Sequence, residues 1–353
     1  MRAREKTIEF LQWMVEQPSP SHHEQAFSRA LAERLGQRGW RAHTDEVGNT
    51  IATLGDGDTC IALLGHIDTV PGEVPVRIED GRLYGRGAVD AKGAIGAFVE
   101  AVELLDESER AGKQFLLLGC VEEEVAITRG AFHVRERYRP DFVINGEPSG
   151  AHALTIGYKG LVRAELEYRA SLRHTASRDY RAAAEHLVEA WSTLRARCDE
   201  WNRVRPLFEQ DLPSLTSFQT GTTETEEWAR ASVNIRTGPD TDGERLLSLL
   251  GGVPGVDVKA LSNKGAVSTD GNDELSRAFK KAIRERGARP TLRLKTGTSD
   301  WNTVARAWRV PTLAYGPGDS SLDHTPHEHI RLDEYEEGIA VLARVLTLLP
   351  TRP

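Results

Sequence analysis

The sequence of 353 residues is poor in cysteine and contains no long hydrophobic run. Its three cysteines, Cys60, Cys120 and Cys198, are far apart and form no Cys-x-x-Cys pair, so neither a disulfide framework nor a thiolate zinc site is expected. No apolar run approaches the roughly 18 residues of a membrane helix, and the mixed-charge start does not resemble a signal peptide. We therefore expect a cytoplasmic protein without a membrane anchor.

Positive charge is also in deficit, with 45 Lys and Arg against 53 Asp and Glu and a net charge of −8. This balance argues against a general nucleic-acid binder. The hydrophobic share of 39% and the charged share of 28% are ordinary for a globular protein. A chain of this length can bury the core of one large domain or of two moderate ones.

Three short apolar runs mark the first part of the chain, at 60–65, 114–119 and 142–145. Such runs are typical of strands that are buried on both faces of a helix-covered, largely parallel sheet. Helical patterns between them, at 93–107 and 130–137, predict an α/β fold. Ser21, followed three residues later by Glu24, predicts a capping box that opens a further helix.

The alternation of short apolar runs with helical patterns ends after residue 157. Strand and helix signals then follow one another in the order βαββαβ, and they give way near residue 265 to further helix and strand signals, ending in an amphipathic helix at 333–348. We predict a catalytic domain of residues 1–157 and 265–353, with a mixed, largely parallel sheet. An α+β domain of residues 158–264 is expected to be inserted into it.

Histidine and acidic residues follow the apolar runs. His66 and Asp68, in Gly-His-Ile-Asp-Thr-Val, come directly after the first run and point the same way, because strand side chains alternate. Glu122, Glu123 and Glu124 follow the second run. The ends of strands are where open α/β sheets build their sites.

Three further acidic or imidazole positions extend this set: Asp90, Glu147 and His324. Asp90 stands in Gly85-Arg-Gly-Ala-Val-Asp-Ala-Lys-Gly93, where it replaces the third glycine of a dinucleotide-binding fingerprint, so we reject that function. Glu147 follows the third apolar run, and His324 lies near the carboxyl terminus. Each alone is compatible with a purely structural role, but together these imidazole and carboxylate groups indicate a catalytic zinc or similar divalent ion.

The order of these motifs resembles the aminoacylase/carboxypeptidase family of co-catalytic zinc hydrolases, which includes acetylornithine deacetylase and succinyl-diaminopimelate desuccinylase. Nearly the whole chain takes part in the resemblance. It implies a zinc-exopeptidase-like catalytic domain, an inserted dimerisation or lid domain and a homodimer. It also implies two Zn²⁺ ions, for which Co²⁺ can substitute, and a cis peptide bond between Asp90 and Ala91.

The resemblance assigns a role to each residue of the set. His66 and Glu147 would bind one ion, Glu124 and His324 the other, and Asp90 both, while Asp68 would orient His66. Glu123 would act as the general base towards a water whose pKa the ions lower to about 7. A shift of one residue in the alignment would give that role to Glu122.

The inserted domain and one loop supply the remaining residues that the resemblance implies. His174 matches an oxyanion-stabilising histidine that the family takes from the partner subunit, although the glycine that usually precedes it is missing. Asn234 and Arg236 match binders of the substrate carboxylate, a group that suits the guanidinium fork. Lys295 and Thr298 lie in a loop similar to the family's substrate loop.

Several motifs, such as Tyr315-Gly-Pro-Gly-Asp-Ser-Ser-Leu-Asp-His324, are most similar in residue order to those of the LysK-type hydrolases. These release lysine or ornithine from the C-terminal glutamate of an acidic amino-group carrier protein, in lysine and arginine biosynthesis. Over residues 158–206, ten Lys and Arg stand against seven Asp and Glu, a surplus that suits an acidic partner or merely a solvated helix face. Small N-acyl amino acids or dipeptides are alternative substrates, and a catalytically silent metal-binding protein is an alternative of another class.

Overall fold

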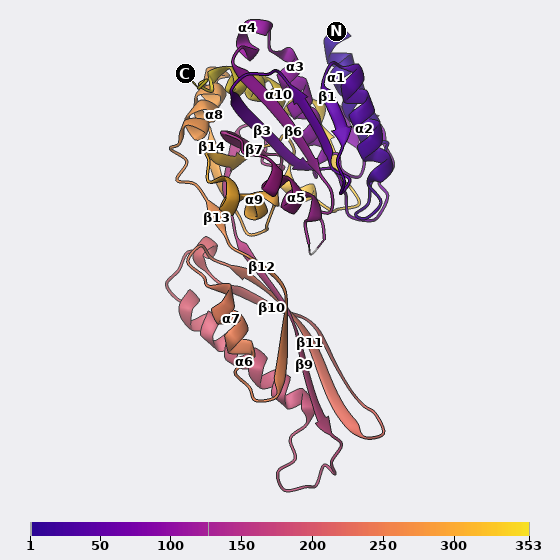
Figure 1. Ribbon diagram of the computed structural model, residues 1–353, viewed down its shortest axis with the longest axis vertical. Helices are drawn as coiled ribbons and strands as arrows, with labels where there is room; N and C mark the ends of the chain where they lie inside the picture. The colour runs from indigo at the N-terminus through magenta and orange to yellow at the C-terminus, as the bar shows by residue number, and fades with distance from the viewer. Residues whose placement is uncertain (1, 126, 353) are drawn as a thin grey trace. The chain divides into compact units, whose positions relative to one another are not determined.

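The computed structural model describes residues 2–125 and 127–352, which divide into two compact units (Figure 1). The first unit comprises the chain up to Gly157, then Ser268–Leu294 and the residues from Ser299 onward. The second comprises Tyr158–Val267 and Lys295–Thr298. The sequence placed the second boundary at 264/265 and kept residues 295–298 with the catalytic domain, whereas in the structure the boundary is 267/268 and these four residues group with the second unit.

The first unit is built on a mixed sheet of nine strands within the described residues, in the order β1-β2-β6-β3-β7-β15-β8-β13, with β14 paired to β8. The strands β6, β3, β7 and β15 run parallel to one another, whereas the pairs β1–β2, β2–β6 and β15–β8 are antiparallel. This confirms the predicted α/β class. The strands are β1 Arg41–Thr44, β2 Thr50–Leu54, β3 Thr59–His66, β6 Lys113–Cys120, β7 Phe142–Asn145, β8 Ala153–Tyr158, β13 Val267–Ser268, β14 Thr291–Lys295 and β15 Thr312–Ala314.

Helices cover both faces of this sheet. On one face, Ile61, Leu63 and Leu117 pack with residues of α1, α2, α3, α8 and α10. On the other, Ala62 and Leu64 pack with residues of α5 and α9. Alternate residues of each strand therefore need apolar partners on opposite sides, which explains the continuous apolar runs. The helices are α1 Arg2–Val15, α2 Gln25–Gln37, α3 Lys92–Leu104, α4 Glu107–Arg110, α5 Arg129–Arg137, α8 Glu274–Glu285, α9 Asp300–Trp308 and α10 Leu332–Leu348.

The parallel strands end at one edge of the sheet. In the ladder, His66 pairs with Cys120 and Leu64 with Asn145, so the loops after β3, β6 and β7 leave from the same edge. A small separate sheet, in the order β16-β5-β4, pairs a segment near the carboxyl terminus with the hairpin that precedes the Asp90 loop. Its strands are β4 Arg77–Glu79, β5 Arg82–Tyr84 and β16 His329–Arg331.

The second unit is a four-stranded sheet in the order β10-β11-β9-β12, all pairs antiparallel. Its helices are α6 Ala183–Asn202 and α7 Gly243–Leu250, and its strands are β9 Gly160–Ser171, β10 Leu212–Thr222, β11 Glu226–Thr237 and β12 Val256–Lys264. Leu187, Leu194 and Leu246 of the helices pack on Val162 and Val233 of the strands, so the helices cover one face of the sheet. The βαββαβ order matches the sequence pattern.

Two local expectations were wrong or incomplete. The predicted capping box at Ser21 and Glu24 is absent: Glu24 itself is the cap residue of α2 and makes no side-chain cap bond, and the Ser21 hydroxyl donates instead to Asp68. Helix α9 is not predicted from the sequence; it begins at Asp300, directly after the loop of Lys295 and Thr298. No described helix is long and apolar enough to cross a membrane.

Candidate metal centre

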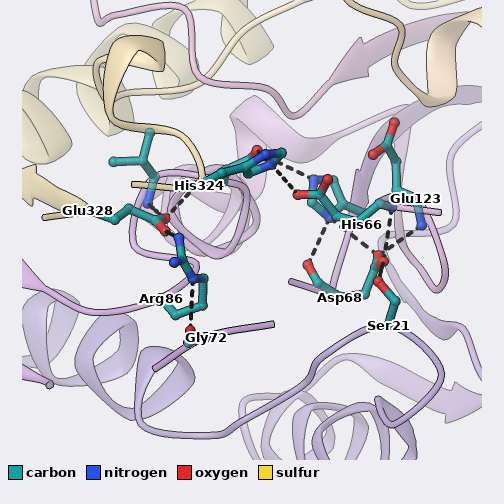
Figure 2. A network of polar contacts seen from close by, with 11 residues as sticks. Ser21, His66, Asp68, Gly72, Arg86, Glu123, His324 and Glu328 are labelled. Carbon is teal, nitrogen blue, oxygen red and sulfur yellow. Dashed lines mark hydrogen bonds and ion pairs between the residues drawn. The ribbon is translucent and has the colours of Figure 1, made fainter. Parts of the chain in front are cut away.

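His66 ends β3 with its ring buried, at 2% exposure. Its Nδ1 lies 3.0 Å from the carbonyl oxygen of Asp68 and 3.4 Å from the Oδ1 of the same residue (Figure 2). Burial acts to lower the pKa of His66, but hydrogen bonds to Asp68 and Asp90 outweigh it and raise that pKa. With Nδ1 held by Asp68, the ring presents Nε2 to Asp90, the orientation that a metal-binding histidine needs.

Asp90 lies on a tight loop between β5 and α3. Glycine is needed for packing at both ends of this loop, since a Cβ on Gly85 would lie 2.1 Å from Val15 Cγ1 and one on Gly93, at the start of α3, would lie 2.4 Å from the Ala88 carbonyl oxygen. The loop therefore packs closely against α1 and against itself. The Asp90–Ala91 bond is cis, as the resemblance implies.

The two carboxylate oxygens of Asp90 face two different imidazoles. Oδ1 lies 3.0 Å from His66 Nε2, and Oδ2 lies 3.1 Å from His324 Nε2. Burial acts to raise the pKa of Asp90, but its hydrogen bonds with both imidazoles outweigh burial and lower that pKa. A carboxylate that offers one oxygen to each side has the geometry of a bridging ligand.

His324 joins Asp90 to Glu124. Its Nε2 lies 2.8 Å from Glu124 Oε1, and hydrogen bonds to Asp90 and Glu124 raise the pKa of His324 to about 10. The backbone of His324 has φ 61°, in the left-handed region that non-glycine residues seldom adopt. Such strain is characteristic of functional sites when the surroundings enforce it.

Asp68 also fixes the loop of three glutamates. Its Oδ1 accepts a hydrogen bond from the Glu123 amide at 3.0 Å, and its Oδ2 accepts from the Glu124 amide at 3.1 Å and from the Ser21 hydroxyl at 2.8 Å. Glu122 has φ 61°, and its Oε1 accepts from Arg129 at 2.7 Å. The carboxylate of Glu122 is therefore engaged away from the ligand set, which favours Glu123 as the base.

Glu123 lies among like charges. Burial is the main cause that raises its pKa well above the ordinary value, and the nearby carboxylates of Glu147, Asp300 and Glu124 add to it. Glu147 is 9% exposed and follows β7. A carboxylate whose pKa is raised is suited to exchange a proton near neutral pH.

The donor set fits divalent cations. One ligand atom from each of His66, Asp90 and Glu124 lies within 4.8 Å of the others. Counting Asp68, Glu123 and Glu147, five carboxylates share this half-buried region with two imidazoles, and such an excess of negative charge is costly without a counter-charge. Oxygen and imidazole donors without a thiolate suit zinc or a similar ion.

The predicted substrate residues Asn234, Arg236, Lys295 and Thr298 all belong to the second unit. Arg236 Nη1 donates to Thr298 Oγ1 at 3.3 Å, so the structure brings these two together. The Oδ1 of Asn234 is buried and accepts no hydrogen bond from the described residues. His174 lies on an exposed turn of the same unit, where its Nδ1 accepts from the Ala176 amide.

Four further residues of these two regions are not predicted as site residues from the sequence. For Ser21 the sequence predicts only a helix cap, and for Asp300 it predicts no role. No role is predicted for Glu328, four residues after His324, although its side chain accepts hydrogen bonds from the Asp90 loop. Arg163 lies opposite Asn234 in the β9–β11 ladder, a cross-strand relation that only the register reveals.

Comparison with known proteins decides the family. The model of peptidase family M20/M25/M40 matches residues 62–348. The chain belongs to the M20 peptidase family. It is therefore a metal-dependent amide or peptide hydrolase. A solved M20 family metallo-carboxypeptidase from Sulfolobus solfataricus shares its fold, with a TM-score of 0.79 and 20% identity over 97% of this chain and 98% of the other.

Two curated M20 relatives are similar along almost their whole length. The [LysW]-lysine hydrolase of Deinococcus radiodurans is 39% identical over 97% of this chain and 96% of its own. A putative [LysW]-lysine/[LysW]-ornithine hydrolase of Pyrococcus furiosus is 37% identical over 98% of both chains. A solved Bacillus subtilis protein, described as a dinuclear metal-binding peptidase of the M20 family, has a TM-score of 0.70 and 13% identity over 98% of this chain and 97% of its own.

The two adjacent glutamates allow a matched test of the base. We expect Glu123→Gln to lower kcat by about 10²–10⁴-fold, the usual worth of general acid–base catalysis, and to leave the metal content unchanged. Glu122→Gln, which removes the charge that faces Arg129 and His22, should keep most of the activity. Steady-state kinetics with metal analysis checks both variants. The reverse order of effects would mean that Glu122 is the base.

Proposed function

We propose that this enzyme releases lysine or ornithine from an amino-group carrier protein. It hydrolyses the amide that joins the amino acid to the C-terminal glutamate of the carrier, as a step of lysine or arginine biosynthesis in the cytoplasm. The observation that carries this proposal is the full-length similarity to relatives named for hydrolysis of LysW-linked lysine and ornithine. The complete set of ligand-type residues at the sheet edge supports it.

The residues of the first unit divide the chemical work between them. His66, Asp90, Glu124, Glu147 and His324 would hold two divalent ions, Zn²⁺ by preference and Co²⁺ as a substitute, with Asp90 shared between the ions. When bound, these ions supply polarisation of the amide carbonyl and a lowered pKa for the attacking water. Glu123 takes the proton from that water and returns it to the nitrogen of the departing amino acid.

The residues of the second unit would bind the substrate. Arg236 offers a guanidinium fork to a carboxylate, and Asn234, two residues before it on β11, would donate its side-chain amide N–H to the same group. Lys295 and Thr298 would contribute from the adjoining loop. Arg163, across the ladder from Asn234, adds a further positive charge on the same sheet. These charges suit an acidic carrier whose linked amino acid also bears a carboxylate.

Carrier-linked lysine gives the direct test. The enzyme should release free lysine from it, detected by mass spectrometry. We expect kcat/KM to exceed that for acetyl-lysine, acetylornithine and succinyl-diaminopimelate by at least about 100-fold, because contacts with the carrier add remote binding energy. A peptide of the carrier's last residues, linked in the same way, separates recognition of the linkage from recognition of the folded carrier. Faster turnover of a small acyl amino acid would favour the alternative substrates.

His174 connects catalysis with assembly. We propose a homodimer in which His174 of one subunit stabilises the oxyanion at the metal centre of the other, as in the resembling family. His174→Ala should then lower turnover by about 100-fold or more without loss of metal, since one oxyanion donor is worth roughly 2.7–4 kcal/mol.

A mixture of His174→Ala and Glu123→Ala subunits gives the sharper test. If the sites are shared, each mixed dimer regains one complete site from two inactive parents. Subunit exchange is verified by native mass spectrometry of differently tagged chains. Exchange without any recovered activity would mean that His174 does not act across a dimer.

A further inference from the structure

Glu328 is a fully buried carboxylate that none of the roles above uses. It lies four residues after His324 and directly before β16, in the first unit. Its Oε1 accepts hydrogen bonds from the backbone amides of Val89 at 3.0 Å and of Asp90 at 3.1 Å. Glu328 therefore fixes the loop that carries Asp90, and one of its two contacts is with the backbone amide of Asp90 itself.

The other oxygen of Glu328 is engaged as well. Oε2 accepts from Arg86 Nη1 at 2.7 Å, and the Arg86 Nε donates to the carbonyl oxygen of Gly72 at 3.1 Å (Figure 2). The backbone carbonyl of Glu328 accepts from the Gly85 amide at 3.2 Å. Glu328 thus contacts four residues of the loop from Gly85 to Asp90, and Arg86 extends these contacts to the segment that follows Asp68.

The same short segment carries His324, whose Nε2 lies 3.1 Å from Asp90 Oδ2. Asp90 and His324 are far apart in the sequence and are connected here through Glu328. A buried carboxylate is stable only when its oxygens are paired, and Glu328 meets this condition with one guanidinium and two amide donors. Glutamine could not do the same, because its amide group would direct N–H donors at Arg86 or at the backbone amides.

We propose that Glu328 is a positioning residue for the metal centre. It fixes the direction of the Asp90 carboxylate relative to His324, so that one oxygen of Asp90 serves each ion. This role rests on the two-ion centre of the proposed function, but it does not depend on the identity of the substrate. Outer partners of this kind typically change metal affinity by about 10–100-fold when they are substituted.

Titration with Co²⁺ tests the role without any substrate. The full chain, stripped of metal, is titrated with Co²⁺ alone, and binding is followed by calorimetry and by the visible absorption of the bound ion. The wild-type chain should bind two equivalents. Glu328→Gln should weaken at least one of them by about 10–100-fold and alter the absorption bands, because the ligand geometry changes.

A matched control separates positioning from plain loss of stability. Asp211 is another buried carboxylate that accepts from a backbone amide, that of Gly238, but it lies in the second unit. Asp211→Asn should lower the melting temperature and leave both Co²⁺ affinities and the spectrum as in the wild type. Glu328→Asp, which keeps the charge but is shorter by one methylene, serves if the glutamine variant does not fold, and it should also weaken Co²⁺ binding.

Two results would overturn the proposal. One is a folded Glu328 variant that binds two Co²⁺ ions with wild-type affinity and an unchanged spectrum. The other is an equal loss of Co²⁺ affinity in Asp211→Asn, which would trace the effect to stability. A wild-type chain that binds no Co²⁺ would overturn the metal centre itself, and this role of Glu328 with it. Failure of the carrier assay alone, with Co²⁺ binding as described, would reject the substrate and retain Glu328 as a positioning residue.

Discussion

The first unit depends on one electrostatic constraint: carboxylates crowd at the edge where its parallel strands end. Asp68, Asp90, Glu123, Glu124 and Glu147 share this region with only two imidazoles, and burial raises the pKa values of Glu123 and Glu124. Such a cluster persists only if donors or cations balance it. The backbone amides, Ser21 and the two histidines supply part of that balance, and divalent ions would supply the rest.

Two buried carboxylates, Asp68 and Glu328, connect the loops of the site without being ligands in this account. Asp68 accepts from the amides of Glu123 and Glu124 while it contacts His66, so it relates the end of β3 to the loop after β6. Glu328 relates the Asp90 loop to the segment of His324 in the same manner. Residues from distant parts of the sequence are thereby held within bonding distance of one another, and such preorganisation is what catalytic geometry requires.

Much of this arrangement could be predicted because it follows from burial. The runs at 60–65, 114–119 and 142–145 are apolar at every position since both faces of the sheet are covered, and their parallel order brings the acidic residues after them to one edge. The remainder depends on tertiary contacts. Ser21 looked like a helix cap because its partner Asp68 is 47 positions away, and the amides that Glu328 accepts from are 238 and 239 positions away. The direction of each glutamate in 122–124 depends on the positive φ of Glu122, which no residue pattern indicated.

Anomalous diffraction from a zinc-loaded crystal would test the central claim most directly. Two peaks about 3.5–4 Å apart are expected, with one oxygen of Asp90 towards each. His66 and Glu147 should coordinate one ion and Glu124 and His324 the other, with Asp68 contacting His66 and neither ion. Ions bound away from Asp90, or a single ion with Asp68 among its ligands, would rule out a two-ion centre bridged by Asp90.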